Sequence, residues 1–346
     1  MAHTYVIGEV GQNHNGSMII AKEIIDRVAQ PQVDELTGEA LAPMDAVKFT
    51  KRDLKEELTD SAMRRPYSGR NSFGPTYGEH RQALELDDEQ HFELYQYAKE
   101  RGLEFVETLC ARGCLTMLNH FRPDRLKVAS RDLTNLPLLE AMAETEIPMI
   151  LSTGMGGPKE LNDALTAITK YHKDVSILHC ISQYPAEYKN INLETITWLK
   201  EQFPQHKIGY SDHSIGIMIP VAAVAKGAEI IEKHITLDRD MRGTDQKGSL
   251  APEGIHRMMR DIRNLEHAIG EKGMFISEAV QGSKVKLQRS IASRIDLKAG
   301  DTIKEEHIHM LSPGDGVQWA DRSTMIGKTV KQDIAANEII YPQFFQ

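Results

Sequence analysis

The chain has 346 residues and a formal net charge of −9, with 40% hydrophobic and 26% charged residues. This composition is typical of a globular protein, and the length suits one large domain plus a small one. The acidic balance argues against nucleic acid or an anionic membrane as the main partner, but a local basic cluster can still bind a small anionic substrate.

The first residues lead directly into the apolar run Tyr5–Val10, and nowhere does an apolar stretch approach the length of about 18 residues that a membrane span needs. We therefore expect neither a signal peptide nor a transmembrane helix, and a cytoplasmic location. Three cysteines suit a reducing compartment. Cys110 and Cys114 have no second Cys/His pair beside them, so we expect buried free thiols rather than a zinc site.

Short β-rich apolar runs alternate with amphipathic stretches along most of the chain. Each run is apolar almost throughout, as expected of a parallel strand covered on both faces. Eight such units predict an α/β fold, a (β/α)8 TIM barrel, with a doubly wound open sheet as the alternative. The predicted strands are Tyr5–Val10, Ala46–Thr50, Glu104–Cys110, Arg125–Ser130, Pro148–Thr153, Val175–Ser182, Lys207–Ser211 and Glu229–Leu237. The predicted helices include Ser17–Ala29, Asp87–Glu100, Asn192–Gln202, Ile215–Lys226 and Pro252–Ile269.

The chain departs from this rhythm in a long loop and in its tail. Asp60–Glu85 follows the second strand at the catalytic end of a barrel, where long loops usually serve function. We predict a barrel domain over residues 1–280, a polar linker over 281–289 and a small β-rich domain over 290–346. A domain of that size is near the lower limit for folding alone, so we expect it to lean on the barrel or on a partner chain.

Polar side chains gather at the predicted C-terminal strand ends, where barrels of this kind carry their chemistry. Lys48 and Lys127 end otherwise apolar strands, and a buried lysine needs an anion. They predict either a clamp for the phosphate and carboxylate of a small dianion or internal ion pairs with Glu9 or Glu107. Hydroxyl groups that would add hydrogen-bond donors are those of Thr108, Ser130, Ser152 and Ser211.

Two histidines on adjacent predicted strands suggest a metal site. A single histidine in a strand is more often a hydrogen-bonded core residue, but His213 and His234 lie near the carboxylates of Glu232 and Asp245. Only two nitrogen donors suggest a loosely held Mn²⁺ or Mg²⁺, with water and a substrate oxygen completing its shell. His14 is either a third ligand or a residue that orders its loop.

Six motifs in this order resemble the sialic acid synthase (N-acetylneuraminate synthase) family. The tail resembles the SAF (antifreeze-like, β-clip) domain of the same family, so the resemblance spans nearly the whole chain. The motifs are the segments 9–16, 46–49, 127–130, 151–155, 209–214 and 231–236, which begin at Glu9, Ala46, Lys127, Leu151, Gly209 and Ile231.

The resemblance implies a C–C bond-forming transferase (EC 2.5.1) that uses phosphoenolpyruvate. Its acceptor would be N-acetylmannosamine or a related N-acetylhexosamine, and its products a nine-carbon 3-deoxy-ulosonic acid and phosphate. The alternatives are a legionaminic or pseudaminic acid synthase, or another phosphoenolpyruvate-dependent sugar aldolase. The resemblance also implies Mn²⁺ as cofactor, with Mg²⁺ or Co²⁺ as alternatives, and a domain-exchanged homodimer.

The same resemblance assigns roles to residues of this chain. His213 and His234 would hold the metal, and the carboxylates of Asp132 and Glu9 would serve catalysis. The predicted phosphoenolpyruvate contacts are Lys48, Thr108, Lys127, Ser130, Ser152, Ser182 and Ser211. The predicted sugar contacts are Tyr184, Glu232, Asp245 and Asn71.

The chain departs from the bacterial family pattern at four positions. Asp132 stands where those members carry Glu, although animal-type members use Asp. Arg131 replaces a small residue and either adds a cation near the phosphate or points away. Ser182 stands where Asn is common, and Ser312 replaces an Arg that reaches the N-acetyl group of the sugar. Either Asp315 or Arg322 would have to compensate for the missing Arg.

Three further readings compete with the sugar-acid synthase. A synthase of a phosphorylated seven- or eight-carbon acid needs an extra basic cluster, which Arg64, Arg65 and Arg70 in the long loop would supply. A non-catalytic sugar-binding barrel has only the departures above in its favour. An iron oxygenase built on Glu232 and His234 lacks the usual ligand spacing.

Overall fold

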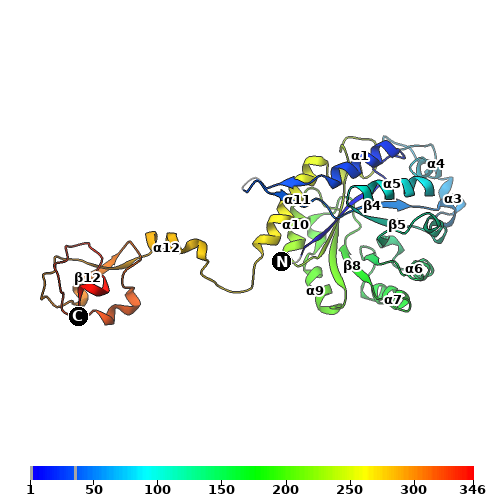
Figure 1. The fold of residues 1–346 in the computed structure, drawn as a ribbon. Helices are drawn as coiled ribbons and strands as arrows, with labels where there is room; N and C mark the ends of the chain where they lie inside the picture. The colour runs from blue at the N-terminus through cyan, green and yellow to red at the C-terminus, as the bar shows by residue number, and fades with distance from the viewer. Residues whose placement is uncertain (1–2, 35–36) are drawn as a thin grey trace. The chain divides into compact units, whose positions relative to one another are not determined.

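The computed structural model describes residues 3–34 and 37–346. The chain divides into two compact units, Met1–Gly270 and Glu271–Gln346, and each is described by itself. In the first unit eight parallel strands close into a barrel, in the order β1-β10-β9-β8-β7-β6-β5-β4 (Figure 1). The predicted TIM barrel is confirmed, and the open sheet is excluded. The strands are β1 Tyr5–Gly11, β4 Ala46–Lys51, β5 Glu104–Leu109, β6 Arg125–Val128, β7 Met149–Ser152, β8 Val175–Cys180, β9 Lys207–Asp212 and β10 Ile230–His234.

Helices surround the barrel and bury its outer face (Figure 1). α5 begins where sequence signals predict, because Asp87 and Gln90 form a reciprocal capping box at its start. The segment between β4 and α5 contains three short helices, of which α3 and α4 lie in the long loop Asp60–Glu85. A two-stranded pair, β2 Gln32–Val33 and β3 Ala40–Leu41, follows α1. The helices of this unit are α1 Met18–Ala29, α2 Leu54–Glu57, α3 Asp60–Met63, α4 Tyr77–Gln82, α5 Asp88–Glu100, α6 Leu136–Ala143, α7 Pro158–Ile168, α8 Tyr188–Ile191, α9 Glu194–Gln202, α10 Met218–Ala225 and α11 Pro252–Ala268.

Alternation along the strands places the polar rim. Side chains two residues apart in a strand point to the same face. One layer of the barrel interior is therefore apolar and includes Ala46, Val106 and Ile230. The next inward positions of the same strands are Lys48, Thr108 and Glu232, which line a cavity. Along each of these strands, the inward side chains therefore change from a packed apolar layer to a polar site over two residues.

The second unit is a small β-rich domain with its own apolar core, as the tail sequence predicts. β11 Ser290–Ser293 pairs antiparallel with β12 Ile308–Leu311. Two similar segments of the tail meet through Leu297 and Ile334, which exchange backbone hydrogen bonds of 2.8 Å in both directions. Residues 281–287, expected within a linker, form helix α12 Gln281–Leu287. This helix accepts a hydrogen bond from Gly314 at Val285, so it belongs to the second unit.

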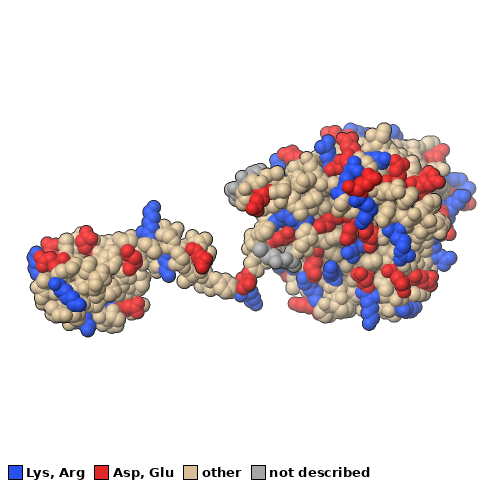
Figure 2. Space-filling model, viewed as in Figure 1, with Lys and Arg blue, Asp and Glu red and all other residues tan. Residues whose placement is uncertain are grey.

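Surface charge is mixed on the face of the barrel unit drawn in Figure 2, where Lys and Arg are interspersed with Asp and Glu. Within the described ranges, no helix has the length and apolar character that a membrane crossing demands.

Replacement of Leu94 by Ala tests the contact between α5 and the barrel. Leu94 is fully buried in the main core, so the cavity should lower the free energy of unfolding by about 2–5 kcal/mol. Ile19→Ala is the matched control, because that side chain is 80% exposed and its loss should cost less than about 0.5 kcal/mol. Urea denaturation of the full chain measures both, and equal effects would contradict the packing described.

Candidate active site

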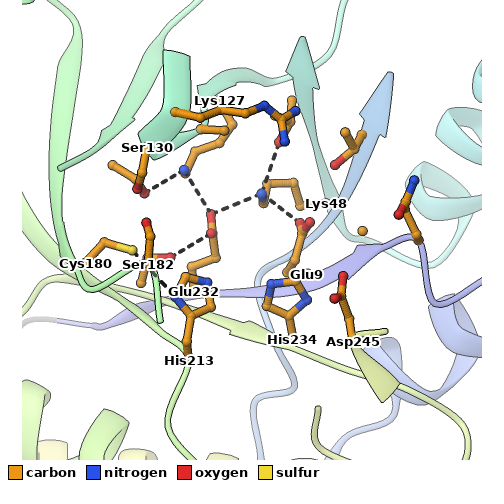
Figure 3. Close-up of a pocket in the computed structure, with 18 of the residues that line it drawn as sticks. Glu9, Lys48, Lys127, Ser130, Cys180, Ser182, His213, Glu232, His234 and Asp245 are labelled. Atoms are coloured by element: carbon orange, nitrogen blue, oxygen red, sulfur yellow. Dashed lines mark hydrogen bonds and ion pairs between the residues drawn. The ribbon is translucent and has the colours of Figure 1, made fainter. Parts of the chain in front are cut away.

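A cavity of about 280 Å³ opens at the C-terminal ends of the barrel strands (Figure 3). It brings together most of the residues that the sequence singles out. Asp132 and Asn71 are the two predicted site residues that do not line it. The predicted residues that do line it are Glu9, Lys48, Thr108, Lys127, Ser130, Ser152, Ser182, Tyr184, Ser211, His213, Glu232, His234 and Asp245.

Two lysines and two carboxylates form a buried charge cluster at the floor of this cavity (Figure 3). The Lys48 Nζ lies 2.7 Å from Oε2 of Glu9 and 3.4 Å from Oε2 of Glu232. The Lys127 Nζ lies 3.8 Å from the same Glu232 oxygen. Internal ion pairing of Lys48 is therefore present, with Glu9 and Glu232 as partners. Glu107 contacts His91 instead, at 2.9 Å.

Burial and charge act against each other within this cluster. Burial raises the pKa of Glu9, and the charge of Glu232 adds to the effect while Lys48 opposes it. Burial would also raise the pKa of Glu232, but Lys127 and Lys48 outweigh it and lower that pKa to about 2. Burial lowers the pKa of Lys127. The two carboxylates thus act as counter-ions to the two lysines, a role that a bound dianion would take over.

A row of hydroxyl groups borders the lysines. Ser152 Oγ accepts a 2.6 Å hydrogen bond from Lys127, and Ser130 Oγ accepts one of 3.0 Å from the backbone N–H of Gly154. Ser182 Oγ is buried and has no hydrogen-bond partner in the described part of the chain. A Cβ at Gly154 would lie 2.5 Å from Ser182 Oγ and 2.8 Å from Ser130 Oγ. Glycine at 154 therefore keeps these hydroxyls accessible.

The two predicted metal ligands lie side by side, with their ring centroids 5.5 Å apart. His213 Nδ1 donates to the carbonyl of Ile181 at 2.9 Å, which leaves Nε2 with a free lone pair in the neutral ring. His234 Nδ1 is buried and has no hydrogen-bond partner among the described residues. Burial lowers the pKa of His234, although Asp245 opposes this. Both rings can thus offer a nitrogen to a cation.

The pair is not part of a larger protein cluster. Among the described residues, no group of three or more His, Cys, Asp or Glu side chains is arranged to hold a metal ion. His14 serves its loop instead, because its Nδ1 accepts a 3.0 Å hydrogen bond from the backbone N–H of Gly16. Any cation at His213 and His234 would need water or substrate oxygens as further ligands.

A second buried ion pair lies on the outer face of the strands that lead to these histidines. Lys233 and Asp212 are register partners on β10 and β9 and are completely buried, with Nζ 2.5 Å from Oδ2. Asp212 Oδ1 also accepts a 3.0 Å hydrogen bond from the backbone N–H of Ser214. The pair therefore fixes the two strand ends that carry His213 and His234. In the sequence, the signal for this pair is a charged residue of opposite sign at an outward-facing position near the end of each of the two neighbouring strands.

A charge network that the sequence did not predict occupies the β4 and β6 side of the cavity. Arg131 lies 3.3 Å from Asp132 and 3.6 Å from Glu57, and Arg52 pairs with Glu57 as well. Asp132 therefore faces Arg131 rather than the cavity, and burial raises its pKa. Burial also raises the pKa of Glu85, a neighbour of Arg52, to about 7.

The long loop is joined to the loop after β10 by Asn71. Its Oδ1 accepts a 3.4 Å hydrogen bond from the backbone N–H of Gly243. A second cavity of about 320 Å³ lies beside the first and shares Tyr184, His213, His234, Thr244 and Asp245 with it. Its remaining lining includes Arg239 and Lys247. The histidine pair is thus common to both cavities.

The chain thus combines a closed barrel, a cavity floor of lysines and carboxylates, a histidine pair at the rim and a small β-rich C-terminal unit. The comparisons with known proteins assign this combination to a class of C–C bond-forming synthases. The family model of the NeuB family matches residues 38–274, more than half of the chain, and the SAF domain model matches residues 288–346. The chain belongs to the NeuB family, whose members are synthases of the sialic acid type, and it carries a C-terminal SAF domain.

Known proteins similar to this chain differ in the sugar acid that they are named for. It is 31% identical to human N-acetylneuraminate-9-phosphate synthase, over 97% of this chain and 91% of the human protein. It is 32% identical to N,N'-diacetyllegionaminic acid synthase of Legionella pneumophila, over 96% and 92% of the two chains. The solved N-acetylneuraminic acid synthetase of Leptospira borgpetersenii, in complex with citrate, has a TM-score of 0.68 and 29% identity, over 81% of this chain and 90% of that one.

Replacement of Lys233 by Met tests the buried support of the histidine pair. The change leaves Asp212 buried without its counter-charge, which should lower the free energy of unfolding by about 3–5 kcal/mol. Lys159→Met, which breaks an exposed pair with Asp163, is the control and should leave the urea midpoint unchanged. The double variant Lys233→Met/Asp212→Leu should recover most of the stability. A Lys233→Met protein as stable as the parent would contradict this account.

Proposed function

We propose that this protein condenses phosphoenolpyruvate with an open-chain N-acetylhexosamine to give a nine-carbon 3-deoxy-ulosonic acid and phosphate, with a divalent cation at His213 and His234. The observation that carries the proposal is that the Lys48 and Lys127 cluster and the histidine pair line one cavity. Two relatives support it, since one is named as a synthase of N-acetylneuraminate-9-phosphate and the other as a synthase of N,N'-diacetyllegionaminic acid.

The floor of the cavity suits phosphoenolpyruvate. Lys48 and Lys127 provide two buried cations, one for the phosphate and one for the carboxylate. The hydroxyl groups of Thr108, Ser130 and Ser152, together with those of Ser182 and Ser211, surround them. Hydrogen bonds between charged partners in a buried site are short and strong, so this cluster can hold a dianion in one orientation.

The histidine pair fits a loosely held cation, because one buried nitrogen has no partner and the other ring is oriented by a carbonyl. We propose Mn²⁺ as the ion, with Mg²⁺ and Co²⁺ as alternatives. When bound, it would supply Lewis-acid polarisation of the acceptor aldehyde. The Tyr184 ring packs against the His213 ring, with centroids 4.0 Å apart and planes inclined at 42°. Together with Asp245 and Glu232, Tyr184 would contact the acceptor sugar.

The reaction forms one C–C bond and breaks the C–O bond to phosphate. The methylene carbon of phosphoenolpyruvate attacks the aldehyde carbon, and a water adds to the carbon that bears the phosphate. The tetrahedral adduct then expels phosphate with C–O cleavage and leaves a ketone. The two protons of that water end on the new hydroxyl group and on phosphate.

Glu9 is the carboxylate best placed to carry a proton in this sequence of steps. It lines the cavity, and burial raises its pKa, which favours uptake of a proton by this carboxylate. Asp132, the other predicted catalytic carboxylate, would have to turn away from Arg131 to reach the cavity. Glu9 would therefore accept the proton of the attacking water.

Phosphate release from phosphoenolpyruvate tests the function. The purified full chain is given N-acetylmannosamine, N-acetylglucosamine and diacetamido-dideoxyhexoses, each free and as a terminal phosphate monoester, with Mn²⁺ or with EDTA. We expect release that needs an acceptor, stops with EDTA and matches the 3-deoxy-ulosonic acid formed, detected by mass spectrometry. A folded, metal-supplied protein that releases no phosphate with any acceptor would overturn the proposal.

Replacement of Lys127 by Met tests the dianion clamp. Loss of a charge-assisted hydrogen bond should raise the KM for phosphoenolpyruvate by about 10- to 100-fold, since such a bond contributes about 1.5–3 kcal/mol. Lys170→Met, an exposed lysine paired with Glu140, should leave both steady-state constants unchanged. An unaltered KM in Lys127→Met would place the anion elsewhere.

The domain-exchanged homodimer also stays a prediction, which light scattering of the purified chain tests.

A further inference from the structure

Arg131 lies between the cavity and two internal carboxylates. It follows Ser130 in the turn after β6, and its side chain lines the cavity and is 36% exposed. On the protein side, its Nε lies 3.3 Å from Oδ2 of Asp132 and its Nη2 lies 3.6 Å from Oε1 of Glu57. Its guanidinium can therefore pair either with these carboxylates or with an anion in the cavity.

The contacts that hold Arg131 on the protein side are weak. Asp132 Oδ2 is buried and has no hydrogen-bond partner among the described residues, so its contact with Arg131 is an ion pair without a hydrogen bond. The guanidinium donates a hydrogen bond of 2.8 Å to Cys110 Sγ. Burial raises the pKa of that thiol to about 11, so the acceptor is a neutral sulfur, which accepts hydrogen bonds poorly. Movement of Arg131 toward the cavity would therefore break no strong hydrogen bond.

Glu57 does not depend on Arg131 for its counter-charge. Arg52 donates to Oε1 of Glu57 at 2.5 Å, and the Arg52 side chain is only 7% exposed. Glu57 would therefore stay paired if Arg131 moved. Of the two carboxylates beside Arg131, Asp132 alone would lose its cation.

An anion held by the floor of the cavity would lie close to this turn. Lys127 and Ser130 are both at the end of β6, and Lys127 donates to Ser152 Oγ at 2.6 Å. A guanidinium forms paired hydrogen bonds with phosphate oxygens, so a phosphate group here would compete with Asp132 for Arg131. The basic residues that the sequence suggested for a terminal phosphate are exposed and line neither of the cavities described above; they are Arg64, Arg65 and Arg70.

We propose that Arg131 controls the position of Asp132: the phosphate group of phosphoenolpyruvate replaces Asp132 as the partner of Arg131, and Asp132 then turns into the cavity. The inference rests on the proposed function and adds a control that the substrate exerts on a carboxylate of the site. It accounts for a carboxylate that the sequence assigns to catalysis and that the structure places against an arginine.

This exchange of partners should also change the protonation of Asp132. The groups that face it are Arg131 and Asn135 from its own segment, Glu57 from α2 and Cys110 from the end of β5. Burial raises the pKa of Asp132, and Arg131 is the main group that opposes the rise. Loss of Arg131 to the phosphate removes this opposition, and the bound dianion adds negative charge, so the pKa should rise further. Asp132 would then enter the cavity with a proton and would not repel the dianion.

Calorimetric binding of phosphoenolpyruvate and of pyruvate, without an acceptor and with Mn²⁺ present, tests the phosphate contact. Pyruvate has the same carboxylate but no phosphate. We expect Arg131→Met to raise the Kd for phosphoenolpyruvate by about 10-fold or more and to leave the Kd for pyruvate unchanged. Arg122→Met is the matched control, because Arg122 is exposed and precedes β6 at its opposite end.

A second variant keeps this test valid if Arg131→Met does not fold, which urea midpoints check. Arg131→Met/Asp132→Asn leaves no carboxylate unpaired at the turn. Its Kd for phosphoenolpyruvate should exceed that of Asp132→Asn by about the same 10-fold or more.

Proton uptake on binding tests the release of Asp132. Titration of phosphoenolpyruvate in buffers of different ionisation enthalpy gives the number of protons taken up with each ligand. Wild type should take up more protons than Asp132→Asn and more than Arg131→Met, in which Asp132 has no arginine to lose. Pyruvate should give no such difference between wild type and the variants.

Each other outcome contradicts a defined part of the proposal. An equal Kd for phosphoenolpyruvate in wild type and Arg131→Met would overturn the phosphate contact. A weakened Arg131→Met with equal proton uptake in wild type and Asp132→Asn would overturn the release of Asp132. A folded wild-type protein that binds no phosphoenolpyruvate would instead count against the proposed function itself.

Discussion

The rest of the site depends on the burial of two lysines in the barrel interior. A buried ammonium group requires a counter-charge, and Glu9 and Glu232 provide it. These carboxylates in turn oppose the effect of burial: they outweigh it at Lys48, whose pKa is raised, whereas burial still lowers the pKa of Lys127. A ligand that binds here must therefore compete with internal carboxylates, and only a dianion with two separated anionic groups can satisfy both lysines at once. Phosphoenolpyruvate, the substrate that we propose, has this form.

The strand pattern was sufficient to predict the barrel and most of the cavity lining. Apolar runs set the strands, and the rule that chemistry lies at their C-terminal ends placed Lys48, Lys127, His213 and His234 together. The predicted strands over 125–130 and 229–237 end beyond the last paired residues, because the polar rim residues follow the end of the ladder. Membership of the NeuB family then follows from the match of its family model to residues 38–274.

What the sequence did not predict depends on side-chain direction in loops and short helices. Asp132 follows β6 in a single 3-10 turn, and Arg131 draws its carboxylate away from the cavity. Arg81 lies in the long loop far from any strand, so no periodic pattern assigns it to the site. Its place in the cavity lining depends on the fold of that loop, which brings α4 beside Gln12. The sequence likewise did not predict helix α12, because its polar residues resemble those of a linker.

The alternation of inward and outward side chains along each strand limits how this enzyme can change. Substitution at a single inward position near a strand end exchanges one catalytic or binding group and leaves the outer packing untouched. Deletion of one residue within β10 would instead turn Glu232 and His234 outward and bring Lys233 into the barrel, since neighbouring side chains point to opposite faces. New substrate specificities in this architecture are therefore expected to arise by point substitution at the strand ends and by loop replacement, while the lengths of the strands stay constant.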